Sequence, residues 1–221
     1  MSLTKFFWKI SDYLKVASFQ SNGYIAGRDG RLYEVRENYL GRLVVPAEFI
    51  PSLDEVKPGF KFSLPKIPGR LLIQTLAFFR SYCTEWEQNE VMTIIYWDMW
   101  RQEYILDCPM QEVSKFHINA TFDDKYIGRN SDRYLPIMHI HSHNTMEAYF
   151  SSVDNQNEKR YMLYMVVGRL DEQEPSISLR VGCNGSFING LPIEKYFNCP
   201  ILDDTETSYP SEWDDRVTIM K

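Results

Sequence analysis

Three of the four histidines in the chain alternate over five positions, close to a serine and an aspartate. His139, His141 and His143 would share one face of an extended strand, because side chains alternate between its two faces. The outer two would stand about 13 Å apart, so only a neighbouring pair can bind the same ion. Counted from His141 and His143, the sequence satisfies H-x-H-x(7)-S-x(2)-D with Ser151 and Asp154. Two imidazoles and one carboxylate are a frequent ligand set of catalytic zinc, with a fourth position open for water.

The spacing also distinguishes the histidines from one another. Counted from His139 and His141 instead, the serine position holds Tyr149 and the aspartate position holds Ser152, so this register fails. We therefore predict that the later pair binds one Zn²⁺ per chain together with the aspartate, and that His139 is a buried neighbour. An H-x-H pair alone is common, and the competing interpretation is a set of structural histidines. His117 has no partner at a ligand spacing and is predicted to be structural.

A zinc site of this kind also needs a general base. Zinc lowers the pKa of bound water to about 7, and a nearby carboxylate can take the proton. Glu90, in "NEVMTIIYW", follows a predicted helix and begins the first strongly β-prone run, where a rigid strand end could hold its side chain. Glu85, Glu87 and Glu103 lie nearby, and the ordinary interpretation of each is a solvated side chain.

The segments "EVM" at 90–92 and "HSHNTMEAYFSSVD" at 141–154 resemble the JAMM, or JAB/MPN, zinc metallopeptidases. That family includes deubiquitinating subunits of the proteasome lid and of the signalosome. The resemblance implies an α/β fold, a mixed sheet flanked by helices and related in outline to the cytidine deaminases. It implies that His141, His143 and Asp154 bind zinc and that Glu90 polarises the water and protonates the leaving amine. Ser151 would donate to the developing oxyanion, although it could also cap a helix that begins near Asp154.

A narrower resemblance covers most of the chain. "NGYIAGRDGRLYEVRE" at 22–37, the stretch at 141–181 and "NGSFING" at 184–190 are similar to the A protein of the PRTRC system of bacterial plasmids and phages. This resemblance implies a ThiF-like partner and a ubiquitin-like protein as substrate. Thr93 stands where eukaryotic JAMM proteins usually have glycine, and Asn144 stands where they usually have proline. Neither position supplies a metal ligand, but both put the carry-over of substrate specificity in doubt.

The elements that must position these residues can be outlined from periodicity. Residues 1–66 form a small, mostly β region with turn signals and a proline-rich linker. Residues 67–200 are predicted to form an α/β domain, which the resemblance identifies as the zinc peptidase domain, beginning with an amphipathic helix that has Leu72, Leu76, Phe79 and Cys83 on one face. Strand-like runs follow, among them one continuous run at 112–121. Residues 201–221 are predicted to form an acidic, solvated tail.

The composition is that of an ordinary globular protein, with 44% hydrophobic residues, 24% charged residues and a net charge of −6. No basic patch favours nucleic acid or a membrane surface, and no apolar run is long enough to span a bilayer. The start has no signal-peptide pattern, and the four cysteines are widely spaced, so a reducing cytoplasm is expected. The prediction is a zinc-dependent peptidase or isopeptidase acting on a protein or peptide, and the alternative is a non-catalytic scaffold module. A deaminase is excluded because H-x-E…P-C-x-x-C is absent.

Overall fold

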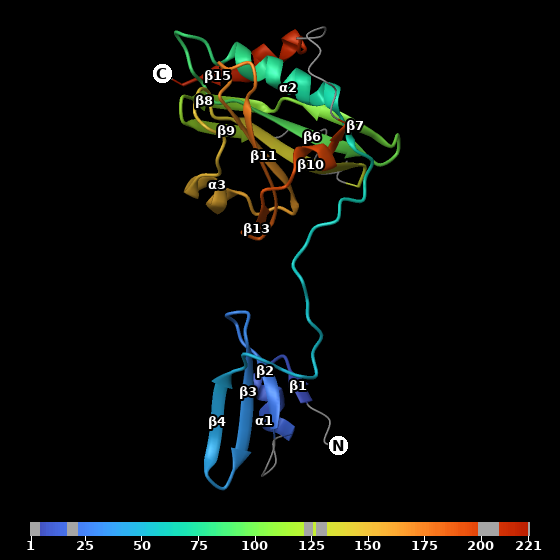
Figure 1. Cartoon of the computed structure of the whole chain (residues 1–221), viewed down its shortest axis with the longest axis vertical. Helices are drawn as coiled ribbons and strands as arrows, with labels where there is room; N and C mark the ends of the chain where they lie inside the picture. Colours follow the sequence, from blue (N-terminus) through green and yellow to red (C-terminus); the bar gives the residue numbers. More distant parts are fainter. Residues whose placement is uncertain (1–4, 17–21, 122–125, 127–131, 199–207, 221) are drawn as a thin grey trace. The chain divides into compact units, whose positions relative to one another are not determined.

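The computed structural model describes residues 5–16, 22–121, 126, 132–198 and 208–220, and the chain divides into two compact units, residues 1–58 and 59–221 (Figure 1). Residues 59–66, which the sequence suggests are part of a linker, belong to the second unit. Phe60, Phe62 and Leu64 pack against its core, and the rings of both phenylalanines lie against Tyr196.

The first unit is a small sheet with one helix. Its strands lie in the order β1-β2-β3-β4, with β1 parallel to β2 and the other pairs antiparallel. The elements are β1 (Lys5–Phe7), α1 (Ile10–Val16), β2 (Asn22–Ala26), β3 (Leu32–Asn38) and β4 (Gly41–Pro46). Tyr13, Ile25 and Val35 form the buried cluster, and the ring of Phe7 meets that of Tyr13 edge-on. The predicted mostly β N-terminal region is present.

A six-stranded mixed sheet forms the centre of the second unit, within the part of the chain that the structure describes. Its order is β13-β12-β11-β10-β6-β7; β10 and β11 pair in parallel, and the other neighbours are antiparallel. The strands are β6 (Met92–Asp98), β7 (Glu103–Asp107), β10 (Tyr134–Ser142), β11 (Met162–Gly168), β12 (Ser176–Cys183) and β13 (Ser186–Asn189). A parallel pair needs a crossover connection. Here the crossover carries α3 (Ser152–Asn157) and with it the aspartate of the motif.

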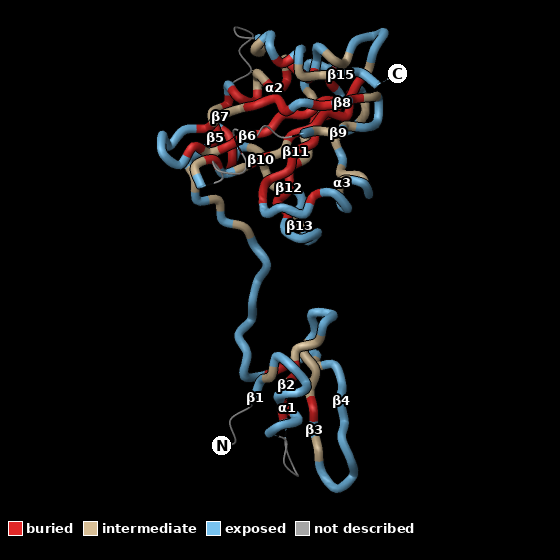
Figure 2. The backbone as a smooth tube through the Cα atoms, turned by 180° about the vertical axis from the view of Figure 1, so that it is seen from behind, coloured by how far each residue is buried: buried red, intermediate tan, exposed pale blue. Residues whose placement is uncertain are grey.

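Helix α2 (Gly69–Ser81) packs on one face of this sheet. Leu72, Leu76 and Phe79 are buried against residues of the central strands, as the apolar period predicts, and Cys83 lies just beyond the end of the helix. Figure 2 shows that the buried backbone is concentrated in α2 and in the central strands of this unit. The predicted fold class, a mixed sheet flanked by helices and preceded by a mostly β region, is confirmed. None of the described helices has the length and apolar character needed to cross a membrane.

A second, three-stranded sheet has the order β15-β8-β9. The run at 112–121, predicted as one strand, is instead a tight hairpin of β8 (Met110–Ser114) and β9 (His117–Thr121). Ser114 pairs directly with His117, so the turn consists of Lys115 and Phe116. Neither turn residue is a glycine or a proline, which explains why the sequence pattern does not reveal the turn.

The described part of the C-terminal segment, residues 208–220, contradicts the prediction of a solvated tail. It forms η3 (Ser211–Arg216) and β15 (Val217–Ile219), and β15 pairs in parallel with β8. Trp213 is buried against the ring of Phe78, and the Arg216 guanidinium lies 3.2 Å from an Asp107 carboxylate oxygen. The segment is acidic on average, but burial of the large apolar side chain of Trp213 fixes it against the rest of the unit. Residues 201–207 and 221 of the predicted tail lie outside the described residues.

A buried carboxylate holds the turn between β6 and β7. Arg133 Nε donates to both oxygens of Asp98 at 3.1 and 3.0 Å, and the backbone amides of Trp100 and Arg101 donate to the same carboxylate. The hydrogen bonds from Arg133 lower the pKa of Asp98 to about 2, below the value near 3.9 of an unfolded chain. The carboxylate therefore stabilises the fold fully above about pH 4, and this contribution is lost as the pH falls toward 2.

We expect Asp98→Asn to lower the free energy of unfolding at pH 7, because the charged pair with Arg133 is lost. The deficit should shrink as the pH falls from 4 toward 2, where wild type loses the same charge. Urea unfolding at pH 7 and pH 3 measures this difference. Asp215→Asn, at an exposed position, is the matched control and should change little at either pH. A deficit that is equal at both pH values would contradict the assignment.

Candidate metal centre

Strand β10 divides its side chains between two environments. Met138 and Ile140 point into the core under α2, and the intervening His139 and His141 therefore face the other side of the sheet. A register shift between Pro136 and Met138 in the pairing with β6 precedes this segment. Since a one-residue shift exchanges the two faces, this bulge decides which side the histidines take.

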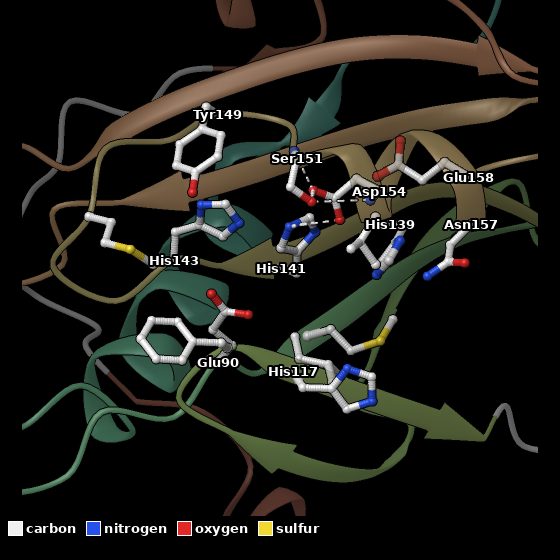
Figure 3. A pocket seen from close by; sticks show the side chains of 15 residues that line it. Glu90, His117, His139, His141, His143, Tyr149, Ser151, Asp154, Asn157 and Glu158 are labelled. Carbon is white, nitrogen blue, oxygen red and sulfur yellow. Dashed lines mark hydrogen bonds and ion pairs between the residues drawn. The ribbon is translucent and has the colours of Figure 1, made fainter.

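Two histidines and the aspartate of the motif converge at the end of β10 (Figure 3). The rings of His141 and His143 have centroids 5.2 Å apart, and His141 Nε2 lies 3.6 Å from Asp154 Oδ1. One nitrogen of each ring and one carboxylate oxygen all lie within 4.8 Å of one another. Burial lowers the pKa of both His141 and His143, so each ring is neutral at pH 7 and offers a lone pair.

Ser151 holds the aspartate in place. Its side-chain oxygen accepts from the Asp154 backbone amide at 3.2 Å, which makes it the N-cap of α3. Asp154 Oδ2 in turn accepts from the Ser151 amide and hydroxyl, each at 2.7 Å, and completes a capping box. Burial opposes ionisation of Asp154, but His141 and the bonds from Ser151 lower its pKa. Oδ1 therefore remains on the side of His141, ionised and directed toward the histidines.

These donors fit a zinc ion. Two neutral imidazoles and one ionised carboxylate, each fixed by a strand or a helix cap, are the donor types of three-ligand zinc sites. The donor atoms of His141, His143 and Asp154 are close enough together to contact one ion. The fold thus brings together the three side chains of the register chosen from the sequence.

Glu90 lies on the opposite wall of the same pocket and points toward His141 and His143 (Figure 3). Its backbone amide donates to the Ser114 carbonyl at 2.9 Å, which ties it to the end of β8. Ser142 ties the next residue, Val91, to β10, since its hydroxyl accepts from the Val91 amide at 2.8 Å. Burial raises the pKa of Glu90 to about 8, and the negative charge of Asp154 adds to this effect. A bound divalent cation would favour the carboxylate form.

The pocket around these residues has a volume of about 380 Å³. One wall is the β8–β9 hairpin, with Phe116, His117 and Ile118, so the histidine predicted to be structural lines the pocket. The ring of Tyr149 meets that of His143 edge-on at 4.8 Å. Neither residue belongs to the motif, and each enters the site through a loop or hairpin that the spacing pattern does not cover.

The loop after β10 explains one departure from the family pattern. Asn144 has φ 48°, a left-handed conformation that asparagine adopts and that proline cannot. Its backbone carbonyl accepts from the Leu170 amide at 2.9 Å, and Gly168 makes the approach of the loop possible. A Cβ at Gly168 would overlap the carbonyl oxygen of Met146. Thr93 is fully buried, with its hydroxyl oxygen 3.4 Å from that of Thr75 on α2.

Sequence reasoning did not find Glu158, which lines the same pocket. Arg180 Nε and Nη2 donate to Glu158 Oε2 at 2.9 and 2.6 Å, and both side chains are almost fully buried. The Arg180 guanidinium lies between the rings of Phe150 and Phe187, 3.7 and 3.8 Å from their centroids. Burial raises the pKa of Glu158 to about 7, against the opposing effect of Arg180. Only tertiary packing brings these residues together, because they come from the C-terminal end of α3, from β12 and β13, and from the loop before α3.

Residues 74–181 match the family model of prokaryotic homologs of the JAB domain. The matched segment runs from within α2 to within β12 and contains His141, His143, Asp154, Glu90 and Ser151. Together with the mixed sheet, this match supports the JAB/MPN family for the second unit. The family includes hydrolases as well as inactive members. A comparison with curated proteins found no match.

Proposed function

We propose that the second unit is a zinc-dependent metallopeptidase or isopeptidase of the JAMM type. The observation that carries the proposal is the convergence of the His141, His143 and Asp154 donor atoms in one pocket with the buried carboxyl of Glu90. Each of these groups has an assigned task in peptide hydrolysis. The family match supports a JAB-type module, and the intact donor set favours an active member.

His141, His143 and Asp154 would hold the zinc, which when bound supplies a Lewis acid that polarises carbonyls and makes water acidic near neutral pH. Glu90 would accept the proton of the attacking water and pass it to the leaving amine. Its position two residues before β6, with its own amide tied to β8 and that of Val91 tied to β10, keeps the carboxylate directed into the pocket. The partly apolar walls, which include Phe116 and Tyr149, would limit access of bulk water.

Ser151 would have two tasks. Its side-chain oxygen caps α3 by accepting from the Asp154 amide, and its hydroxyl hydrogen is donated to Asp154 Oδ2, which fixes that carboxylate. To donate to a developing oxyanion as well, the hydroxyl would rotate away from Asp154 Oδ2, which would keep its bond from the Ser151 amide. A Ser151→Ala change would therefore weaken both the cap and the oxyanion contact.

The substrate that we favour is a ubiquitin-like protein, cleaved at a peptide or isopeptide bond, with a ThiF-like protein as partner. This part rests on the resemblance to the PRTRC A protein, since the pocket itself carries no charge pattern specific to one sequence.

A cytoplasmic location agrees with the three described cysteines, Cys83, Cys108 and Cys183, all of which are free thiols.

Zinc content is the first expected result. Wild type purified without a chelator or a His tag should contain about one zinc per chain, and His141→Ala/His143→Ala should contain none. Chelation should lower stability by about 2.7 kcal/mol at a free zinc concentration of 100 times Kd. Elemental analysis and thermal unfolding with and without chelator measure both. His117→Ala, which alters the same pocket outside the donor set, is the matched control and should keep its zinc.

Hydrolysis tests the proposal directly. The substrates are a ubiquitin-like protein with a C-terminal peptide extension and the same protein joined to a lysine side chain. Zinc-loaded wild type should cleave at least one of them, and the His141→Ala/His143→Ala variant should cleave neither. Zinc binding without any hydrolysis across such a panel would instead favour the non-catalytic binding module.

A further inference from the structure

A second group of possible ligands lies next to the first and shares one residue with it. One nitrogen each from His139 and His141 and one carboxylate oxygen of Glu158 lie within 4.8 Å of one another. The two imidazoles come from the same face of β10, with ring centroids 5.6 Å apart, and the carboxylate comes from the C-terminal end of α3. Figure 3 shows His139 and Glu158 on the side of His141 that faces away from His143 and Glu90.

In this group His139 and Glu158 each have a buried polar atom without a hydrogen-bond partner among the described residues. These atoms are His139 Nε2 and Glu158 Oε1. Such atoms are costly to bury unless a ligand or a water satisfies them. The two side chains line the same pocket, so a small species could reach both. The unpaired atoms therefore point to an occupant.

Glu158 is fixed in the orientation that a ligand needs. Arg180 holds its Oε2 through two hydrogen bonds, and Arg180 is itself held by Asn155 Oδ1 at 2.6 Å and by two aromatic rings. The other oxygen, Oε1, has no hydrogen-bond partner among the described residues and is left for a ligand. A carboxylate that is held through one oxygen and binds through the other is a common arrangement around metal ligands.

We propose that His139, His141 and Glu158 form a second divalent-cation site that overlaps the first through His141. Two imidazoles and a carboxylate select zinc and similar transition metals over magnesium or calcium. Because a neutral imidazole offers one lone pair, the two sites accept one ion at a time. The positive charge of Arg180 opposes a cation at the second site, so this site is the weaker of the two. The inference uses His141, which the proposed function also uses, but it concerns cation binding and not hydrolysis.

The test is a zinc titration by calorimetry on protein first stripped with chelator. His143→Ala/Asp154→Asn lacks the first site and should still bind one zinc, more weakly than wild type. Adding His139→Ala in that background should lower the affinity further by on the order of 100-fold, since losing even an outer partner of a ligand costs 10- to 100-fold. His139→Ala alone should keep the affinity of wild type.

Glu158→Gln in the His143→Ala/Asp154→Asn background is a second, independent variant. It keeps an oxygen for Arg180 but removes the charge that binds a cation, and circular dichroism checks that each variant is folded. The inference is overturned if His143→Ala/Asp154→Asn binds zinc no better than the variant that also lacks His139, since a bridging water would then satisfy the pocket. If neither wild type nor His139→Ala binds zinc tightly, the first site is overturned instead. A failure of the second site can therefore be told from a failure of the first.

Discussion

Glu90→Gln is expected to lower the rate of hydrolysis by about 100- to 10,000-fold while leaving the zinc content unchanged. The glutamine keeps the size and the position of the side chain, two residues before β6, but it cannot accept a proton from water. The carboxyl is outside the donor group of His141, His143 and Asp154, so the metal should stay. Steady-state kinetics on the cleaved ubiquitin-like substrate, with elemental analysis of the same preparation, measure the two quantities together.

Glu87→Gln is the matched control for this substitution. Glu87 lies three residues before Glu90 and is exposed, so its replacement should leave both rate and zinc content near wild type. A Glu90→Gln enzyme with more than about a tenth of wild-type activity would contradict the role of general base. Loss of zinc from the same variant would show that Glu90 acts as a ligand, which also contradicts the assigned role.

The part of the site that lies along one strand and its following loop could be predicted from the sequence. The alternation of His139, His141 and His143 with apolar residues predicts a shared face, and the structure places Met138 and Ile140 in the core on the other. The seven residues before Ser151 are the length of the loop that brings the N-terminus of α3 beside the histidines. The shared face of the histidines and the length of the loop to Ser151 are local features, so the spacing of the residues is enough to predict them.

The rest of the pocket depends on contacts between distant segments. Arg180 has the appearance of an ordinary charged strand residue, and nothing near it in the sequence shows that the rings of Phe150 and Phe187 enclose it. Glu158 follows α3 in a stretch of polar residues that predicts a solvated surface. Its burial arises only when β12 packs beside α3. The composition of the sequence cannot reveal the buried pair of Glu158 and Arg180, because each charge is buried only when the other is there to neutralise it.

The predictions for the C-terminal segment and for the hairpin at 110–121 were wrong because sequence averages and turn signals did not reveal the deciding contacts. The average composition of "DDTETSYPSEWDDRV" is acidic, but the position of the chain is set by Trp213, which packs on Phe78, and by β15, which pairs with β8. In the hairpin, the turn of Lys115 and Phe116 carries no glycine or proline signal. In the C-terminal segment the tertiary contacts outweigh the local average, whereas in the hairpin a two-residue turn forms without the residue types that signal it.

Arg180→Met is expected to destabilise the second unit by about 3–5 kcal/mol at pH 8, because it leaves the buried carboxylate of Glu158 without its partner. Methionine fills part of the space between the two rings but offers no donor to Glu158 or to Asn155. Arg169→Met is the matched control, since Arg169 directly follows β11, is exposed and pairs with Glu147 on the surface. Surface pairs contribute about 0–1 kcal/mol, so this control should unfold at nearly the wild-type urea concentration.

The double variant Arg180→Met/Glu158→Gln separates the pair from its surroundings. Removing the charge of Glu158 should recover a large part of the loss, because the cost of the single change arises from an uncompensated buried carboxylate. Equal instability of the single and double variants in urea unfolding would show instead that the guanidinium acts through its packing between Phe150 and Phe187. A recovered double variant would keep the fold but lack the Glu158 carboxylate. Zinc binding at the first site should then persist, whereas in the His143→Ala/Asp154→Asn background the same double change should remove the remaining zinc binding, which ties the buried ion pair to the second cation site rather than to the first.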